Sequence, residues 1–347
     1  MSLLRVENVT HRYPTTTGPL PVLDNVALDV DSDSVTAVVG ESGCGKTTLG
    51  RVVIGLVKPS AGRVLYRDKD IWRMSRGEWD TYRRGVQVVQ QDPYASLNPG
   101  LSVRDTLRPG LLRHHIVPRG EVEDEILRLF EVVGLDATTD FLRRYPHQLS
   151  GGQRQRVAIA RAISLRPEVV VADEATSMLD VSIRVSVLDL LLSLRAERNL
   201  SYVFISHDFG VVRYFTRGGR IIVMFFGVVV EDGPAEQVIR QPRHPYTYLL
   251  MDAIPVPDPK TARRRRDEAV VEALDDRVEQ PPSQVGCIFS NRCPFVEDAC
   301  RTTRPELTEV SPGHWAACLF PERVPELPES LTDNTAIGYA GVKENTP

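Results

Sequence analysis

The chain carries the stretch Gly40-Glu41-Ser42-Gly43-Cys44-Gly45-Lys46-Thr47, which fits the pattern G-x-x-x-x-G-K-[ST] at every fixed position. An apolar run over residues 35–39 precedes it, and residues 49–56 carry apolar side chains at the spacing of one helical face. A strand, a glycine-rich turn and a helix allow backbone N–H groups to converge on an anion. The stretch therefore predicts a phosphate-binding loop, in which Lys46 reaches the β- and γ-phosphates and Thr47 binds Mg²⁺.

Length and composition limit the class of protein. A chain of 347 residues predicts two domains, and 42% apolar and 25% charged residues are ordinary for a globular protein. The net charge of −4 gives no general case for nucleic-acid binding. The longest apolar run, residues 221–230, is too short to cross a bilayer as a helix, and residues 1–7 show no secretory leader. We therefore expect the chain to stay in the cytosol.

Polar residues follow three buried apolar runs. They are Gln91, the pair Asp173 and Glu174, and His207. Because the carboxyl ends of parallel strands meet at one edge of a sheet, we expect these side chains to share a ligand crevice. Asp173 is suited to hold Mg²⁺, and Glu174 is suited to orient or deprotonate an attacking water.

The remaining pattern predicts a layered α/β fold. Residues 3–39 alternate apolar and polar positions between Pro and Gly breaks, which indicates an antiparallel β layer. Residues 102–165 read as a helical region. Within that region Ser150 is a suitable N-cap, and two glycines after it leave the helix N–H groups accessible to an anion. Tyr13 ends the first strand pattern, where packing is its simplest role.

The ordered set of motifs over residues 3–235 resembles the nucleotide-binding subunit of an ABC transporter. The resemblance implies that ATP binds the loop, the signature and the D-loop, through Gly40, Ser42, Gly43, Cys44, Gly45, Lys46, Thr47, Thr48, Ser150, Gly151, Gly152, Gln153 and Asp180. It implies that Tyr13 stacks on adenine and that Thr47, Gln91 and Asp173 hold Mg²⁺. It also implies catalysis by Glu174, His207, Gln91 and Lys46, with Glu174 as the base.

Two further stretches resemble the dipeptide/oligopeptide (peptide/nickel) importer subfamily, namely residues 91–99 and 242–255. The fold class implied is α/β, an ABC-type P-loop NTPase with a mixed sheet core, an antiparallel β layer and a helical subdomain, followed by a small cysteine-rich extension. The expected domains are residues 1–240, with the helical subdomain at about 92–165, and residues 241–325; a disordered tail is expected at 326–347. Ala175 and Met178 depart from the usual family residues, which affects subfamily detail only.

The resemblance also implies partners. ATP binding would close a head-to-tail dimer with a second, non-identical ATPase subunit, at the cytoplasmic face of the membrane. Two integral-membrane permease subunits would respond, and an extracytoplasmic binding protein would deliver the cargo. The alternatives are a nickel or other small-solute importer of the same subfamily and a soluble ABC ATPase. A coiled-coil type is disfavoured, because only about a hundred residues separate the loop from the signature, without sustained heptads.

Four of the five cysteines, Cys287, Cys293, Cys300 and Cys318, lie in the spacing C-x₅-C-x₆-C-x₁₇-C. Such a cluster in a cytosolic chain is better explained by metal than by disulfides. Thiolates suit Zn²⁺ or an iron–sulfur cluster, although structural zinc sites bring tighter ligand pairs. Reduced structural thiols are the third interpretation. The resemblance to peptide importers favours a [4Fe–4S] cluster with a structural role.

Overall fold

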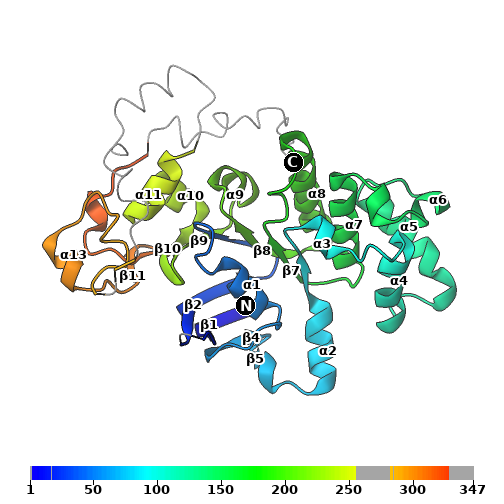
Figure 1. The fold of residues 1–347 in the computed structure, drawn as a ribbon, viewed down its shortest axis with the longest axis horizontal. Coiled ribbons are helices and arrows are strands. Elements are labelled where there is room, and N and C mark those ends of the chain that lie inside the picture. The colour runs from blue at the N-terminus through cyan, green and yellow to red at the C-terminus, as the bar shows by residue number, and fades with distance from the viewer. Residues whose placement is uncertain (1, 17, 255–281, 284, 328–347) are drawn as a thin grey trace. The chain divides into compact units, whose positions relative to one another are not determined.

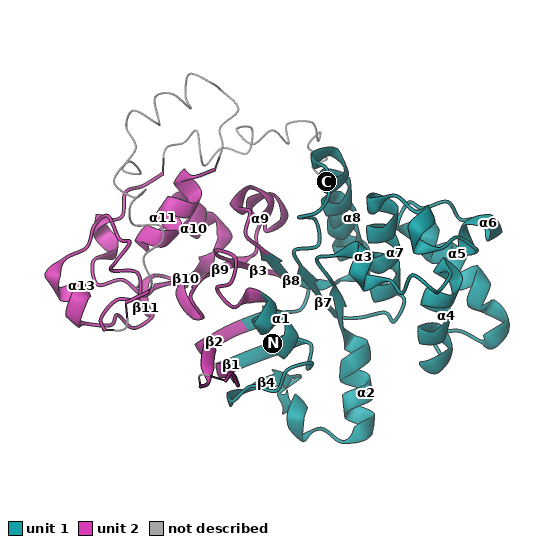
Figure 2. Cartoon of the chain, viewed as in Figure 1, with its two compact units in different colours: residues 1–7, 29–34, 47–205 teal, residues 8–28, 35–46, 206–347 magenta. Residues whose placement is uncertain are grey.

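The computed structural model describes residues 2–16, 18–254, 282–283 and 285–327. The chain divides into two compact units, residues 1–7, 29–34 and 47–205 in the first and residues 8–28, 35–46 and 206–347 in the second (Figure 2). The predicted domain boundary at residue 240 falls within the second unit and stays a prediction. The predicted disordered tail lies outside the described residues from position 328 onward.

Three parallel strands of the first unit lie in the order β8-β7-β6 (Figure 1). Their bounds are Val86–Val89 for β6, Val169–Asp173 for β7 and Ser201–Ser206 for β8. Val169 pairs with Val86 on one side and with Ser201 on the other. The strands therefore start level, and their carboxyl ends fall at one edge, as the polar residues after the apolar runs predicted.

Helices form most of the rest of the first unit. They are α1 (Lys46–Val53), η1 (Ile71–Arg73), α2 (Arg76–Gly85), α3 (Pro93–Ser96), α4 (Val103–Arg113), η2 (Arg119–Glu121), α5 (Val122–Val132), α6 (Thr139–Leu142), η3 (Pro146–Gln148), α7 (Gly151–Ile163) and α8 (Val181–Arg198). The predicted helical region holds α4 to α7, and Figure 1 shows α4, α5 and α6 grouped together. Phe130 and Phe141 meet edge to face at 5.5 Å in its core.

A four-stranded sheet has the order β2-β1-β4-β5. Its bounds are Ser2–Tyr13 for β1, Leu20–Asp31 for β2, Ala61–Tyr66 for β4 and Lys69–Asp70 for β5. Leu4 and Val6 are buried at alternate positions of β1, and Val9 and His11 are buried in the same way after Asn8, whose φ is 50°. This is the alternation that predicted a half-buried layer. Two strands of this layer, β4 and β5, come from beyond residue 60. They pair antiparallel across a short turn.

The strands of the second unit lie in the order β11-β12-β10-β9-β3. Their bounds are Val35–Val39 for β3, Arg220–Phe225 for β9, Val228–Pro234 for β10, Thr308–Ser311 for β11 and His314–Ala316 for β12. Its helices are α9 (Phe209–Phe215), α10 (Ala235–Arg240), α11 (Pro245–Asp252), α13 (Asp298–Thr302) and η5 (Pro321–Arg323). Strand β3 runs parallel to β9, whereas β9, β10, β12 and β11 pair antiparallel.

The longest apolar run of the sequence forms a hairpin. Strands β9 and β10 meet at Phe226 and Gly227, whose φ angles are 43° and 82°. Positive φ at both central residues suits the twist of a two-residue hairpin. In the part of the chain that the structure describes, no helix is long and apolar enough to cross a membrane.

A buried carboxylate ties the end of the chain to this hairpin. Glu231 on β10 has no exposed surface and accepts the N–H groups of Arg243 at 2.7 Å and His244 at 2.9 Å. The ring nitrogen Nε2 of His314 on β12 hydrogen-bonds the same carboxylate at 2.7 Å. Because a buried charge is costly unless it is hydrogen-bonded, these three contacts fix the entry to α11 and the position of β12. The segments around Arg243 and His314 are thus built onto the sheet.

Candidate functional site

The phosphate-binding loop lies between β3 and α1, as the sequence predicted. Gly40 has φ 154° and Gly45 has φ 105°. A Cβ on Gly40 would lie 2.2 Å from the carbonyl oxygen of Met224, and one on Gly45 would lie 2.6 Å from that of Val22. Only glycine fits at these two positions, because the backbone conformation and the space both exclude a side chain.

Lys46 folds back into the loop. Its ammonium group donates to the carbonyl oxygens of Gly40 at 2.7 Å and Glu41 at 2.8 Å, and the residue is 4% exposed. The thiol of Cys44 is also buried, and burial raises its pKa. Ser42 and Gly43 are exposed, whereas Thr48 is buried in the first turn of α1. The loop therefore presents its tip outward and keeps its lysine inside.

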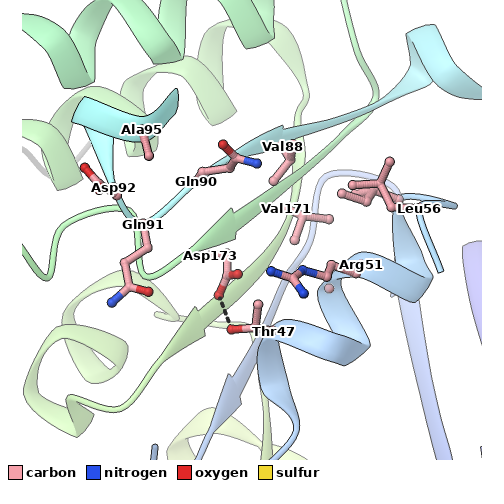
Figure 3. Close-up of a pocket in the computed structure, with 12 residues that line it drawn as sticks. Thr47, Arg51, Leu56, Val88, Gln90, Gln91, Asp92, Ala95, Val171 and Asp173 are labelled. Atoms are coloured by element: carbon pink, nitrogen blue, oxygen red, sulfur yellow. Dashed lines mark hydrogen bonds between the residues drawn. The ribbon is translucent and has the colours of Figure 1, made fainter. Parts of the chain in front are cut away.

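The first unit brings together four of the predicted side chains. The hydroxyl of Thr47 donates to Oδ1 of Asp173 at 3.3 Å, and the amide of Gln91 donates to Oε2 of Glu174 at 2.9 Å. Figure 3 shows Thr47, Asp173 and Gln91 around one pocket. The residues that line this pocket are Thr47, Gly50, Arg51, Ile54, Leu56, Val88, Gln90, Gln91, Asp92, Ala95, Val171 and Asp173. Arg51 and Gln90 were not among the predicted site residues.

Glu174 has a backbone conformation that the sequence did not reveal. Its φ is 47°, in the left-handed region that side chains other than glycine seldom adopt. Its N–H donates to the carbonyl of Ile205 at 2.9 Å, and its own carbonyl accepts the N–H of Ser177 at 3.1 Å. Such strain persists where the surroundings hold it, and these two backbone hydrogen bonds hold it here.

The start of α7 matches its prediction. Ser150 is the N-cap: its hydroxyl accepts the N–H of Gln153 at 3.2 Å, and the Gln153 side chain accepts the N–H of Ser150 at 3.0 Å. This reciprocal capping box fixes the helix start. A Cβ on Gly152 would lie 2.8 Å from Cγ2 of Ile183, so this glycine allows α7 to pack closely on α8. Asp180 is the N-cap residue of α8.

Tyr13 and His207 belong to the second unit. The ring of Tyr13 meets the ring of His11 edge to face at 4.6 Å. His207 directly follows β8 and is exposed. The next residue, Asp208, caps α9 by accepting the N–H groups of Gly210 at 2.9 Å and Val211 at 3.2 Å. Of these two adjacent polar residues, Asp208 is the one that caps the start of α9.

The iron–sulfur prediction is wrong. Cys287, Cys293, Cys300 and Cys318 line one cavity, and all are free thiols. Among the described residues, however, no three Cys, His, Asp or Glu side chains are arranged so that they could hold a metal ion. This finding contradicts the [4Fe–4S] cluster and gives no support to the zinc alternative at these positions.

Burial raises the pKa of Cys293 to about 12 and that of Cys318 to about 11, so both thiols are neutral in this structure. Phe289, Phe295 and Phe320 line the same cavity. Neutral cysteines behave as small apolar residues, so they pack a core here with the aromatic rings. The spacing of the four cysteines along the sequence is compatible both with this packing role and with metal ligation.

Comparisons with known proteins agree with this geometry. Residues 23–177 match the family model described as ABC transporter, and residues 230–300 match the oligopeptide/dipeptide transporter C-terminal region. A protein of Brucella ovis named as a peptide import ATP-binding protein is 41% identical over 317 residues, which covers 91% of this chain and 97% of that protein. The oligopeptide transport ATP-binding protein OppF of Salmonella typhimurium is 41% identical over 301 residues, 86% of this chain and 88% of that protein.

Solved structures give the same fold. A dimeric ATP-binding cassette in a post-hydrolysis state, bound to ADP and phosphate, superposes with a TM-score of 0.60 at 29% identity. It covers 67% of this chain and 98% of that chain. The cbiO1 protein of Clostridium perfringens gives a TM-score of 0.58 at 28% identity and covers 68% and 90%.

The fold and the site thus define an ATPase of the ATP-binding-cassette class, and the predicted α/β P-loop fold is confirmed. Within this class the chain belongs to the family of ABC transporter ATP-binding proteins that carry the oligopeptide/dipeptide transporter C-terminal region. The resemblance drawn from the sequence motifs is therefore confirmed.

Proposed function

We propose that this chain is the ATP-hydrolysing subunit of an ABC importer for di- or oligopeptides. The observation that carries the proposal is the pairing of Gln91 with Glu174, which follow parallel strands, beside the pairing of Thr47 in α1 with Asp173 in the same unit. An amide, a hydroxyl and two carboxylates are groups suited to hydrolysis of a magnesium nucleotide.

The nucleotide phosphates would bind the loop. An anion at the start of α1 would be bound by N–H groups of the loop and of the first helical turn, and the Lys46 ammonium group would exchange its loop carbonyls for phosphate oxygens. Mg²⁺ would be held by Thr47, Asp173 and Gln91, whose oxygen atoms suit a hard cation. When bound, the ion neutralises charge on the phosphates.

Hydrolysis needs little more than positioning. Glu174 orients a water in line with the γ-phosphate and accepts its proton, while the bond between the γ-phosphorus and the bridging oxygen breaks to give ADP and phosphate. Gln91 holds the Glu174 carboxylate in place. His207 is assigned to stabilise the transferred phosphoryl group, and Tyr13 is assigned to stack on adenine.

A second ATPase subunit would complete each nucleotide site. The start of α7 carries Ser150, Gly151, Gly152 and Gln153, of which Ser150 is exposed and Gly151 is half-buried. Its helix N-terminus would bind the γ-phosphate of ATP held by the opposite subunit. Asp180 would lie at the same interface. A non-identical partner, two permease subunits and a place at the cytoplasmic face of the membrane complete the proposal. The nucleotide-binding domain is proposed at residues 1–240 and the extension at 241–325.

The C-terminal region supports a peptide cargo over the alternatives. The match over residues 230–300 is to a region described for oligopeptide and dipeptide transporters, and the relatives quoted above carry peptide import or oligopeptide transport in their names. A nickel or other small-solute importer is the second candidate, since the cargo is selected by other subunits.

The test is uptake in cells that lack this chain but express the other subunits of its transporter. Restoring the wild-type chain should restore accumulation of a radiolabelled tripeptide, and Glu174→Gln should not. Glu197→Gln makes the same change at an exposed position of α8 and is the matched control. Restored nickel accumulation without tripeptide accumulation would reject the peptide cargo, and the absence of ATP-dependent uptake of either would reject the importer.

A further inference from the structure

Glu41, the second residue of the phosphate-binding loop, is held from three directions. Its carboxylate accepts hydrogen bonds from both terminal nitrogens of Arg292, at 2.6 Å and 3.0 Å. Its N–H donates to the hydroxyl of Tyr246 at 2.8 Å, and its carbonyl accepts the ammonium group of Lys46 at 2.8 Å. Glu41, Arg292 and Tyr246 all belong to the second unit, so these contacts lie within one compact body (Figure 2).

Arg292 is placed by aromatic rings. Its guanidinium lies 5.4 Å from the ring centroid of Phe225 and 5.8 Å from that of Phe289. The arginine side chain is only 13% exposed, and the Glu41 side chain is 37% exposed. A two-pronged, partly desolvated pair on aromatic faces is stronger and better oriented than a surface ion pair. By contrast, Arg304 and Asp24 pair at 2.9 Å with side chains 56% and 49% exposed.

Tyr246 is equally constrained. It is 1% exposed, and its ring lies 4.8 Å from the ring of Phe225 and 5.4 Å from that of Phe289. The N–H of Tyr246 donates to Nδ1 of His244 at 3.1 Å, and Glu231 anchors the residues just before α11. The hydroxyl that receives the Glu41 N–H is therefore fixed through the sheet.

We infer that Arg292 and Tyr246 are positioning residues, through which the C-terminal extension sets the conformation of the phosphate-binding loop and thereby its affinity for ATP. Neither residue touches the reacting atoms. They act through Glu41, whose carbonyl oxygen accepts a hydrogen bond from Lys46, the residue proposed to bind the nucleotide phosphates. This rests on the proposed binding of ATP at the loop and does not depend on the cargo.

The experiment measures ATP affinity and the KM and kcat of ATP hydrolysis in the full chain within its assembled transporter. Arg292→Gln should raise the Kd and KM for ATP about 5- to 20-fold, the range of moderate coupling between sites. Glu41→Gln should give a similar rise, and the double variant should be no worse than either single variant. Arg304→Gln is the matched control in the same extension and should leave both constants within twofold of wild type.

Tyr246→Phe keeps the ring and removes only the hydroxyl, so it provides a test if Arg292→Gln does not fold. It should raise the Kd for ATP in the same direction with an unchanged melting temperature of the nucleotide-free protein. A wild-type Kd in Arg292→Gln or Tyr246→Phe would overturn the inference, as would additive effects of Glu41→Gln and Arg292→Gln. Failure of the wild-type chain to bind ATP would instead reject the proposed function.

Discussion

The side-chain amide of Gln91 donates a hydrogen bond to the carboxylate of Glu174 at 2.9 Å, although 83 residues separate the two along the chain. Gln91 follows β6 and Glu174 follows β7, and these strands are parallel neighbours. The sheet therefore places a glutamine where it can orient the proposed catalytic base.

We expect Glu174→Gln to retain ATP and lose most turnover. Removing a positioned base typically lowers kcat on the order of 10²–10⁴-fold. The amide also removes a negative charge close to the γ-phosphate, so the nucleotide-bound dimer should persist longer. Steady-state phosphate release and retention of labelled ATP in the assembled complex provide the two measurements. Turnover near the wild-type rate would remove Glu174 from the role of base.

Gln91→Leu should lower kcat about 10- to 100-fold at saturating Mg²⁺ and ATP, because a misplaced catalytic group costs about that much. In a Glu174→Gln background under the same saturating conditions, the change should have almost no further effect on kcat. Gln90→Leu is the control, since the Gln90 side chain lines the same pocket but points away from Gln91 (Figure 3). Equal losses in Gln90→Leu and Gln91→Leu would show that pocket shape, rather than orientation of Glu174, is responsible.

Tyr13→Ala should weaken ATP binding by roughly 1–3 kcal/mol if the ring stacks on adenine, as base stacking on aromatic side chains does elsewhere. Tyr13→Trp should bind ATP about as well as wild type. Titration with a fluorescent ATP analogue gives both affinities. Because the ring also packs on His11 at 4.6 Å, the melting temperature without nucleotide must be compared. A lower melting temperature with equal loss of affinity in both variants would assign Tyr13 to packing.

The protein should lose stability in mild acid through His244. Burial lowers the pKa of His244 to about 3, well below the ordinary value of about 6.5. Above pH 6.5 the ring is neutral in both folded and unfolded chains. As the pH falls from about 6.5 toward 3, only the unfolded chain gains the proton, so the free energy of unfolding falls. The loss from this group should reach about 2 kcal/mol near pH 5.

His244→Asn tests this expectation, because asparagine can still accept the N–H of Tyr246 as the N-cap of α11. Urea unfolding of wild type and His244→Asn near pH 7.5 and pH 5 gives the difference in pH dependence. His115→Asn is the control: the residue is exposed with φ 50°, a conformation that asparagine adopts readily. If wild type and His244→Asn lose the same free energy on acidification, the buried ring is not the cause.

The sequence by itself determined the parts of the site that depend on local structure. The stretch from Gly40 to Thr47 predicted a glycine-rich turn before a helix, because few residues other than glycine adopt its backbone angles. The buried apolar runs predicted parallel strands, and the polar residues after them predicted one edge where Gln91, Asp173 and Glu174 gather. The place of His207 at the same edge stays a prediction. Ser150 predicted a helix start, because a hydroxyl before two glycines can cap it.

Only the tertiary structure decided the contacts between distant segments. Glu41 and Arg292 are 251 residues apart, and no local pattern specifies that their side chains meet. The same holds for His314, which reaches Glu231 because β12 pairs with β10 in one particular register. Four clustered cysteines were consistent with ligation or with a small core, and among the residues that the structure describes their side chains form no metal-binding group. Local backbone preference is encoded within a few residues, whereas these outcomes depend on the packing of whole segments.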